Sequence, residues 1–458
     1  MPTISSINLY FHFLILLAVT IFLIHHFSSQ QTANASIPEP GSLPLLNDTS
    51  IALSDPNLKL EVFVTGIKSP TNMAFLDNGD VLVLEKQNGK VRKIANGYHL
   101  REPLLDVNVA NYDTRGMLGI AVTKNETRGA EYVFLYFTQA GQGLGDGEDR
   151  CKSPGNCIDD SMNQPSGNVL YRFELSNDGK ELINKKLLLK FSALPGATHN
   201  GGEMVVGPDN NIYIITGNAE NKSTVVSNSK NPNVDGKAGI LALDHDGRPA
   251  FPNGILGSED PLNKYYAYGI RNGFGLDFDP ISGKLWDTEN GPTYGDEINL
   301  VEPGFNSGFK RIIGFWMSSG SDEAGIVDDM VDVDDANLED FDGNGKYSSP
   351  ELSWNQPVAP TAIKFLNSNK YGKQYENDIF VGSNIGYVFH FDLKANRTEL
   401  DLKGALKDRI ANNGADELPD NTFGKGFGSI SDITVGPDGY LYIVSLGRGE
   451  IYRIIPSN

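Results

Sequence analysis

A phrase that recurs along the chain constrains its fold more than any other feature. Each copy is a short apolar run, a turn rich in Pro, Asp, Asn and Gly, and a second run of β-forming residues. The copies begin at Met73, Met204, Leu276 and Ile433, with weaker ones near Gly119 and Ala362. Such units, spaced roughly 45 to 85 residues apart, cannot bury their apolar faces alone and stack around a channel. The sequence therefore predicts an all-β, six-bladed β-propeller. A β-sandwich with insertions explains the repeated phrase poorly.

The composition of the 458-residue chain fits strands and turns. It holds 50 Gly and 24 Pro, 10% of its residues are aromatic, and 39% are hydrophobic, which supports a sizeable core. The formal net charge of −20 repels phosphate backbones. We therefore expect no nucleic-acid partner.

The first 35 residues predict export from the cytoplasm. The apolar run from Leu9 to Ile24 is short for a spanning helix, and Ala33-Asn34-Ala35 after it resembles a cleavage site. No Lys or Arg precedes the run. Residues 1–35 are therefore expected to be a signal peptide or an N-terminal membrane anchor. Residues 36–57 are a linker rich in Pro, Ser and Asn, and residues 58–458 are the propeller. The protein would be secreted or anchored to the outer face of the cell membrane.

The cysteines and the glycosylation sequons suit such a compartment. Cys151 and Cys157 lie in one loop and can close a small disulfide ring. A two-Cys metal site is the alternative, but no nearby His or third Cys completes it. Sequons compatible with glycosylation occur at Asn47, Asn125, Asn221 and Asn396.

His199-Asn200-Gly201-Gly202 is the first candidate for chemistry. The chain has seven His, and this one stands in a Gly-rich loop just before an apolar run. A titratable imidazole between glycines, where a ligand can approach closely, is a candidate general base. Taken alone, a loop His is more often a solvated side chain.

Two later loops are polar where a plain blade does not need polarity. Residues 268–275 present Arg271 and Asn272, whose donors suit carbonyl or carboxylate groups. Residues 288–299 contain Gly291-Pro292, whose backbone carbonyls can face a hard cation, and Asp296, which can tune a nearby base. Each loop alone is equally well explained by a local ion pair and a turn.

In this order, the motifs resemble the soluble glucose/sorbosone dehydrogenase family, the aldose sugar dehydrogenases that depend on pyrroloquinoline quinone (PQQ). The resemblance runs from about Leu60 to Ile454. It is carried by Gly116-Met117-Leu118-Gly119, His199-Asn200-Gly201-Gly202, Gly269-Ile270-Arg271-Asn272, Glu289-Asn290-Gly291-Pro292, Asp296-Glu297-Ile298-Asn299 and Pro303-Gly304-Phe305-Asn306.

The resemblance implies a six-bladed propeller that holds cofactor and sugar at the channel mouth. His199 would be the base that removes the proton of the sugar's C1 hydroxyl as hydride passes to the quinone. Arg271 and Asn272 would contact the quinone, with Arg271 stabilising its developing charge. The carbonyls of Gly291 and Pro292 would bind the cofactor's Ca²⁺. Asn290 would flank the cofactor, and Asp296 would hold His199 in its reactive state.

This chain departs from the family at positions that are cationic or amide in its relatives. Asn384 stands where a Lys is expected, Ser429 and Ser431 where two Arg are expected, and Thr114 where a Gln is expected. Because PQQ carries three carboxylates, losing such partners weakens its binding. Lys425, Arg448 or Arg115 would have to compensate.

Residues 340–351 match a twelve-residue Ca²⁺ loop independently of the family. Asp340, Asp342, Asn344, Lys346 (through its carbonyl), Ser348 and Glu351 occupy the ligand positions. Gly345 stands at the sharp turn. Pro350 and the acidic approach argue against flanking helices, so we expect a structural Ca²⁺ loop inserted in the propeller. The alternative is a solvated acidic loop.

The sequence thus favours a PQQ- and Ca²⁺-dependent oxidoreductase of aldoses or related alcohols that needs an external electron acceptor. The first alternative is a non-catalytic carbohydrate- or protein-binding propeller that has lost the cofactor. A second is a Ca²⁺-dependent propeller lactonase, but that class needs acidic metal ligands where this chain offers carbonyls.

Overall fold

The computed structural model describes residues 51–124, 131–141, 145–147, 167–192, 198–219, 228, 234–318 and 337–457. All of them belong to one compact unit, Leu43–Asn458. They contain strands and three short 3₁₀ helices, and no α-helix occurs among them. No helix within these ranges is long and apolar enough to cross a membrane. The predicted leader, residues 36–50 of the predicted linker, the cysteine loop and the sequons at Asn47, Asn125 and Asn221 lie outside the described residues. Residues 51–57 of that linker are described and contain a short strand, Ala52–Leu53. Asn396 is described and exposed.

The strands form sheets that we name by their innermost strand. The β3 sheet contains β3 (Pro70–Phe75), β4 (Val81–Glu85), β5 (Lys90–Ala95), β6 (Tyr98–His99) and β7 (Leu105–Asp106). The β8 sheet contains β8 (Met117–Lys124), β9 (Glu131–Gln139), β10 (Gly167–Leu175) and β11 (Leu182–Phe191). The β12 sheet contains β12 (Met204–Val206), β13 (Ile212–Thr216), β14 (Gly239–Leu243), β15 (Tyr265–Tyr268), β19 (Phe305–Asn306) and β22 (Lys346–Tyr347).

Three further sheets continue this arrangement. The β16 sheet contains β16 (Gly273–Phe278), β17 (Leu285–Glu289), β18 (Asp296–Val301), β23 (Leu352–Trp354) and β27 (Ile410–Ala411). The β24 sheet contains β24 (Pro360–Phe365), β25 (Ile379–Ser383), β26 (Tyr387–Phe391), β28 (Thr422–Lys425) and β1 (Ala52–Leu53). The β29 sheet contains β29 (Ile430–Val435), β30 (Leu441–Ser445), β31 (Glu450–Pro456) and β2 (Leu58–Thr65). The remaining elements are the ribbon β20 (Ile312–Ile313) and β21 (Trp316–Met317), with η2 (Leu262–Lys264), η3 (Gly404–Asp408) and η4 (Gly414–Glu417).

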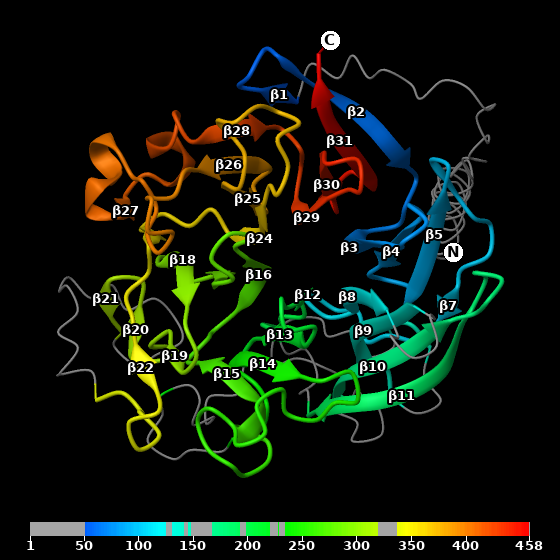
Figure 1. Ribbon diagram of the computed structural model, residues 1–458, viewed down its shortest axis with the longest axis horizontal. Coiled ribbons are helices and arrows are strands. Elements are labelled where there is room, and N and C mark those ends of the chain that lie inside the picture. The colour runs from blue at the N-terminus through cyan, green and yellow to red at the C-terminus, as the bar shows by residue number, and fades with distance from the viewer. Residues whose placement is uncertain are drawn as a thin grey trace, which may run out of the picture. The chain divides into compact units, whose positions relative to one another are not determined.

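The innermost strands surround a common centre (Figure 1). β3 contacts β8 and β29, β12 contacts β8 and β16, and β24 contacts β16 and β29. Every copy of the repeated phrase is the hairpin made by a sheet's two innermost strands, for example β3 with β4 and β29 with β30. The all-β propeller predicted from the repeat is therefore confirmed.

Two pairings between distant parts of the chain close the ring. β2, near the start of the described chain, pairs antiparallel with β31, the last strand. β1 pairs with β28 in the neighbouring sheet. Such closure ties the two ends of the domain together, with β1 and β2 as the outer strands of their sheets.

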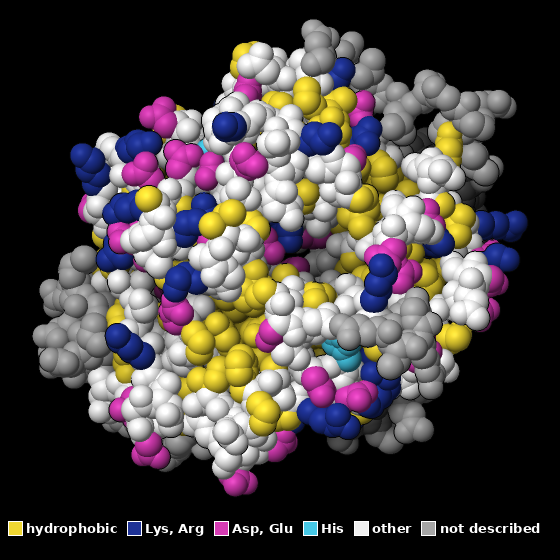
Figure 2. Space-filling model, viewed as in Figure 1, with side chains coloured by type: hydrophobic (Ala, Val, Ile, Leu, Met, Phe, Trp, Pro, Cys, Tyr) yellow, Lys and Arg dark blue, Asp and Glu magenta, His cyan; other side chains and the backbone are white. Residues whose placement is uncertain are grey.

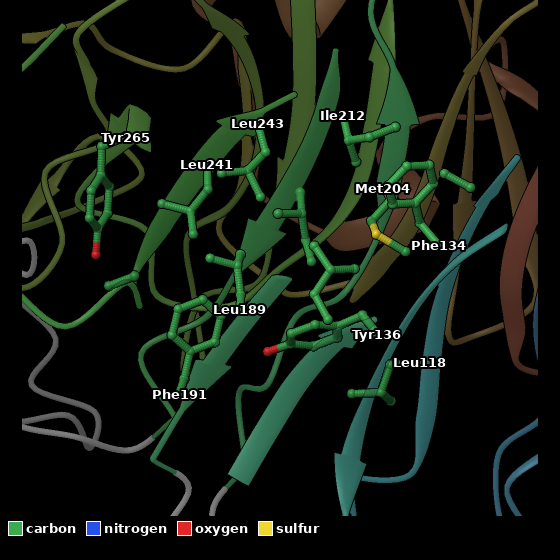
Figure 3. Close-up of a cluster of buried hydrophobic side chains, with 14 of the residues drawn as sticks. Leu118, Phe134, Tyr136, Leu189, Phe191, Met204, Ile212, Leu241, Leu243 and Tyr265 are labelled. Atoms are coloured by element: carbon green, nitrogen blue, oxygen red, sulfur yellow. The ribbon is translucent and has the colours of Figure 1, made fainter. Parts of the chain in front are cut away.

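The core lies between neighbouring sheets. In Figure 3, Leu118, Phe134 and Tyr136 of the β8 sheet pack toward Met204, Ile212 and Leu241 of the β12 sheet. Burying one such side chain contributes about 1.5–3 kcal/mol. Because neighbours cover both faces of a sheet, β4, β13, β17, β25 and β30 are buried throughout. This is why most second strands read as nearly continuous apolar runs rather than alternating ones.

Candidate active site

A cavity of about 570 Å³ lies at one end of the ring of innermost strands. Most of its lining residues lie just before or near the start of an innermost strand, or just after the second strand, and Asp296 begins the third strand β18. In antiparallel hairpins these positions share one end, so the fold itself gathers them. Figure 2 shows the molecule in the same view as Figure 1, and the visible face has a hollow at its centre. The predicted residues that line the cavity are His199, Arg271, Asn272, Asn290, Gly291, Pro292 and Asp296.

The His199 ring is held by Asn218, which follows β13. Its Nδ1 lies 2.9 Å from Oδ1 of Asn218. Because an amide oxygen only accepts, this bond places the proton on Nδ1 and leaves Nε2 as the basic nitrogen. The His199 backbone has φ +58°, a strained conformation for a residue with a side chain. The Ala219 amide donates to its carbonyl over 3.0 Å, which helps to hold that conformation.

Asn200 anchors the same loop to the β8 sheet. Its Oδ1 accepts from Nδ2 of Asn168 over 2.9 Å, and its carbonyl accepts from the Tyr136 hydroxyl over 3.1 Å. Its Nδ2 donates to Oγ1 of Thr114 over 3.1 Å. Asn200 is buried, so these bonds satisfy groups that would otherwise destabilise the fold. The loop that carries His199 is therefore fixed from both sides.

Arg271, in the loop before β16, contacts the loop that joins β17 to β18 in the same sheet. One of its nitrogens, Nη1, lies 3.0 Å from the carbonyl of Asn290 and 3.0 Å from that of Gly291. A Cβ on Gly291 would meet the Tyr294 carbonyl at 1.9 Å, so this position requires glycine. The Gly291 carbonyl, a predicted calcium ligand, thus already accepts from a guanidinium and has one further lone pair for a cation.

Asp296 holds this loop in place. Its carboxylate accepts from the amides of Gly291, Val358 and Ala359 over 2.9, 2.8 and 2.7 Å. Burial raises the pKa of Asp296 to about 6, against the effect of these bonds and of Arg271. In the structure Nδ1 of His199 lies against Asn218, and the role expected for Asp296, holding His199, stays a prediction.

The residues at which this chain departs from the family pattern line the same cavity. Asn384, Ser429, Ser431 and Thr114 are all in its wall. The Ser429 hydroxyl donates to Oδ1 of Asn384, and that of Ser431 donates to the Pro70 carbonyl over 2.9 Å. The expected substitutes, Lys425, Arg448 and Arg115, are not among the lining residues.

Lys86 is a cavity residue that the sequence reasoning missed. Lys86 directly follows β4, just as Asn290 directly follows β17. This equivalent position in the repeat is the sequence feature that could have identified Lys86 as a cavity residue. Its Nζ donates to the Asp113 carbonyl over 2.5 Å. Burial, with a smaller contribution from Arg115, lowers the pKa of Lys86 to about 8, while Asp113 opposes the shift. Within the described part of the chain, Lys86 and Arg271 are the cationic side chains of the cavity wall.

A buried charged group forms the floor of the cavity. The Glu203 carboxylate accepts from Nδ2 of Asn72, and both residues also line a second cavity of about 220 Å³ along the centre. Lys364, whose Nζ lies 2.8 Å from Asp277, and Asp432 belong to the same group of charges. Burial and the nearby Asp432 raise the pKa of Glu203 well above its usual value.

The predicted calcium loop at residues 340–351 lies apart from the cavity. Asp340, Asp342 and Asn344 are exposed in a tight turn, where the Gly345 amide donates to the Asp340 carbonyl over 2.7 Å. Glu351 is buried where β23 begins, 4.0 Å from Nη1 of Arg409. A calcium ion would have to draw Glu351 away from this guanidinium. The loop stays a prediction.

Known proteins share the sequence pattern and the fold. The family model for glucose/sorbosone dehydrogenase matches residues 67–453. The aldose sugar dehydrogenase YliI of Escherichia coli is 24% identical over 425 residues, which cover 91% of this chain and 98% of that protein. Quinoprotein glucose dehydrogenase B of Acinetobacter calcoaceticus is 23% identical over 304 residues, or 61% of this chain and 58% of that one.

Solved structures agree in fold. The apo-form of the soluble aldose sugar dehydrogenase from Escherichia coli superposes with a TM-score of 0.64 at 20% identity, over 87% of this chain and 99% of that one. The PQQ-bound aldose sugar dehydrogenase of Streptomyces coelicolor gives a TM-score of 0.59 at 21% identity, over 88% and 99%. With the family model spanning most of the propeller, the chain belongs to the glucose/sorbosone dehydrogenase family.

Proposed function

We propose that the protein is a PQQ-dependent dehydrogenase that oxidises aldose sugars or related alcohols outside the cytoplasm. The observation that carries the proposal is the position of His199, whose Nε2 is left basic by Asn218, in one cavity with Arg271, Asn272 and Asn290. The matching family and two relatives are named as dehydrogenases, which supports oxidation as the class of reaction. Six sheets of four or more strands within the described ranges support the six-bladed form of the proposal.

The cavity wall fits an acidic, oxygen-rich cofactor. Oδ1 of Asn272 and Oδ1 of Asn290 are buried without a hydrogen-bond partner among the described residues, so each oxygen can accept from an N–H or O–H group of a ligand or bind a cation. Nδ2 of Asn290 already donates to the Pro360 carbonyl over 3.2 Å. Arg271 and Lys86 would face carboxylate or quinone oxygens, and the carbonyls of Gly291 and Pro292 would face its Ca²⁺. When bound, PQQ supplies the two-electron oxidant that no side chain provides.

The chain's own residues account for proton removal. Nε2 of His199 accepts the proton of the sugar's C1 hydroxyl, and Asn218 keeps Nδ1 protonated so that the ring accepts at the opposite nitrogen. Arg271 keeps positive charge beside the site of oxidation and aligns the loop at Asn290 and Gly291. An external acceptor then restores the oxidised cofactor.

Reconstitution tests the proposal directly. Purified apoprotein with Ca²⁺ and PQQ is expected to reduce a dye in the presence of aldoses, and neither component alone should suffice. Titrating the apoprotein with PQQ, followed by protein fluorescence, measures binding separately from turnover. A chain that binds no PQQ at micromolar concentrations would contradict the proposal.

A non-catalytic sugar-binding propeller remains the second candidate. Asn384, Ser429 and Ser431 give the cavity wall neutral hydroxyl and amide groups of the kind that bind sugars. Aldose binding by the apoprotein without any PQQ binding would favour this candidate over the dehydrogenase.

A further inference from the structure

Three metal-ligating side chains meet at the end of the β25–β26 hairpin that is remote from the active-site cavity. Ile379 pairs with Phe391, and Phe380 pairs with His390. The same register places Asp378, just before β25, opposite Asp392, just after β26. Side chains alternate along a strand, so His390 and Asp392 share one face of the sheet. The hairpin therefore brings Asp378, His390 and Asp392 together on that face.

The distances between their ligand atoms suit a single ion. Oδ2 of Asp378 lies 3.1 Å from Nε2 of His390, and this nitrogen lies 3.7 Å from Oδ1 of Asp392. The three ligand atoms lie within 4.8 Å of one another. A tetrahedral Zn²⁺, with bonds of about 2.0–2.2 Å, requires ligand atoms about 3.4 Å apart. The two separations from Nε2 of His390, 3.1 and 3.7 Å, lie on either side of that value.

The imidazole is held in position by aromatic neighbours. The ring centroids of Tyr375 and Phe380 lie 5.0 and 5.1 Å from that of His390. Two of the three ligands are largely buried, whereas 48% of the Asp392 side chain is exposed. An ion here would have a fixed nitrogen ligand and an approach from solvent, which leaves a position for water.

The surrounding charge favours a cation. Asp392, Asp401, Glu417 and Asp420 line an adjoining cavity of about 390 Å³, together with His390 and Lys403. Lys403 lies 3.2 Å from Asp401 and 3.7 Å from Asp392, but 72% of its side chain is exposed, so it can turn away. Like charges facing each other across a strand pair are destabilising, and Asp378 and Asp392 are such a pair.

We propose that Asp378, His390 and Asp392 form a divalent transition-metal site, with Zn²⁺ as the expected ion. Imidazole with carboxylates is a donor set for Zn²⁺ rather than Ca²⁺, which prefers oxygen ligands alone. The ion joins the two strands of the hairpin where they enter and leave the sheet that β1 closes. It therefore stabilises the blade. The site is independent of PQQ chemistry and of the active-site cavity.

Zinc titration of the chelator-treated, full-length protein tests the site. We expect one Zn²⁺ bound per chain with micromolar or tighter affinity at pH 7.5, and a melting temperature that rises with Zn²⁺. His390→Phe keeps an aromatic ring between Tyr375 and Phe380 and is expected to weaken this binding event at least tenfold. Asp378→Asn should weaken it as well, with folding of both variants checked by circular dichroism.

Matched controls separate this site from other zinc ligands. His99→Phe removes an exposed His in β6 and should leave the titration unchanged. Affinity should fall as the pH is lowered, because protons compete with the ion for its ligand atoms. If the wild-type protein and the His390→Phe variant bind Zn²⁺ equally, or if neither binds it at tens of micromolar, the proposal is wrong. PQQ binding should be unchanged in both His variants.

Discussion

The loop at His199 and the loop at residues 340–351 both carry side chains suited to chemistry, but the fold treats them differently. The His199 loop precedes an innermost strand, so the ring of sheets brings it beside Arg271 and Asn290. In the other loop, Asp340 and Asp342 are exposed, while Glu351 enters β23 beside Arg409. A local motif becomes part of a functional site when the repeat places it at the shared end of the hairpins. A ligand spacing that fits a metal loop does not by itself bring such a motif to that end.

The largest effect is expected from His199→Ala. A general base contributes about 10²- to 10⁴-fold to a rate, so turnover should fall within or beyond that range. PQQ affinity should change less than turnover, because the variant keeps Arg271 and Lys86, cationic side chains of the cavity wall. Turnover by the alanine variant at near wild-type rate would remove His199 from the reaction.

Asn218→Leu sharpens the assignment of the base. Without the Oδ1 acceptor the proton is no longer held on Nδ1, so we expect kcat to fall roughly tenfold or more while KM changes less. The pH–rate profile should shift with it. Asn218→Asp keeps an acceptor and serves as the matched control, expected to retain more activity than the leucine variant.

Lys86→Met should weaken PQQ binding, and the loss should depend on pH. Lys86 is charged below its pKa of about 8 and attracts a carboxylate only in that form. Wild-type affinity is therefore expected to decline as the pH rises through 8, while the affinity of the variant stays flat, so that the two converge at pH 9.5. Binding measured by fluorescence at pH 6.5, 8 and 9.5 checks this, and a difference that does not shrink would assign Lys86 a structural role.

Asp296→Asn isolates the contribution of a buried carboxyl to stability. Its folded pKa of about 6 exceeds the ordinary value of 3.8, so its stabilising contribution is complete below 3.8 and is lost as the pH rises through 6. The shift corresponds to at most about 3 kcal/mol at 1.36 kcal/mol per unit. Denaturant unfolding at pH 4 and pH 7 should show a larger decrease for the wild-type protein than for the variant.

Glu351→Gln has the smallest expected effect and examines the second loop. If Glu351 mainly forms an ion pair with Arg409, the variant's free energy of unfolding should fall by about 1 kcal/mol or less. The decrease should be equal in Ca²⁺ and in chelator. If residues 340–351 bind Ca²⁺, the variant should be less stable only in Ca²⁺. Melting temperatures in the two buffers distinguish these outcomes.

The repeat explains how much could be predicted from the sequence. Each recurring phrase predicts a hairpin, and loops at equivalent positions of the hairpins meet at one end, which is why His199, Arg271 and Gly291 were found. Asn218 and Lys86 follow second strands in the same way, but as single polar residues they carry no motif. The role of each side chain depends on which atoms lie beside it in the folded cavity, and these atoms come from other parts of the chain.

The sequence by itself determined the propeller, because hydrophobic periodicity and turn residues act locally and repeat along the chain. It also determined the family, through motifs that stay together in order. The tertiary structure decided which partner each polar group takes: Asn218 for His199, three backbone amides for Asp296, and Arg409 for Glu351. Apart from the Gly291 amide, these partners lie 19 or more residues away along the chain. Hydrogen bonds and charges act only at short range, so no pattern along the chain encodes them.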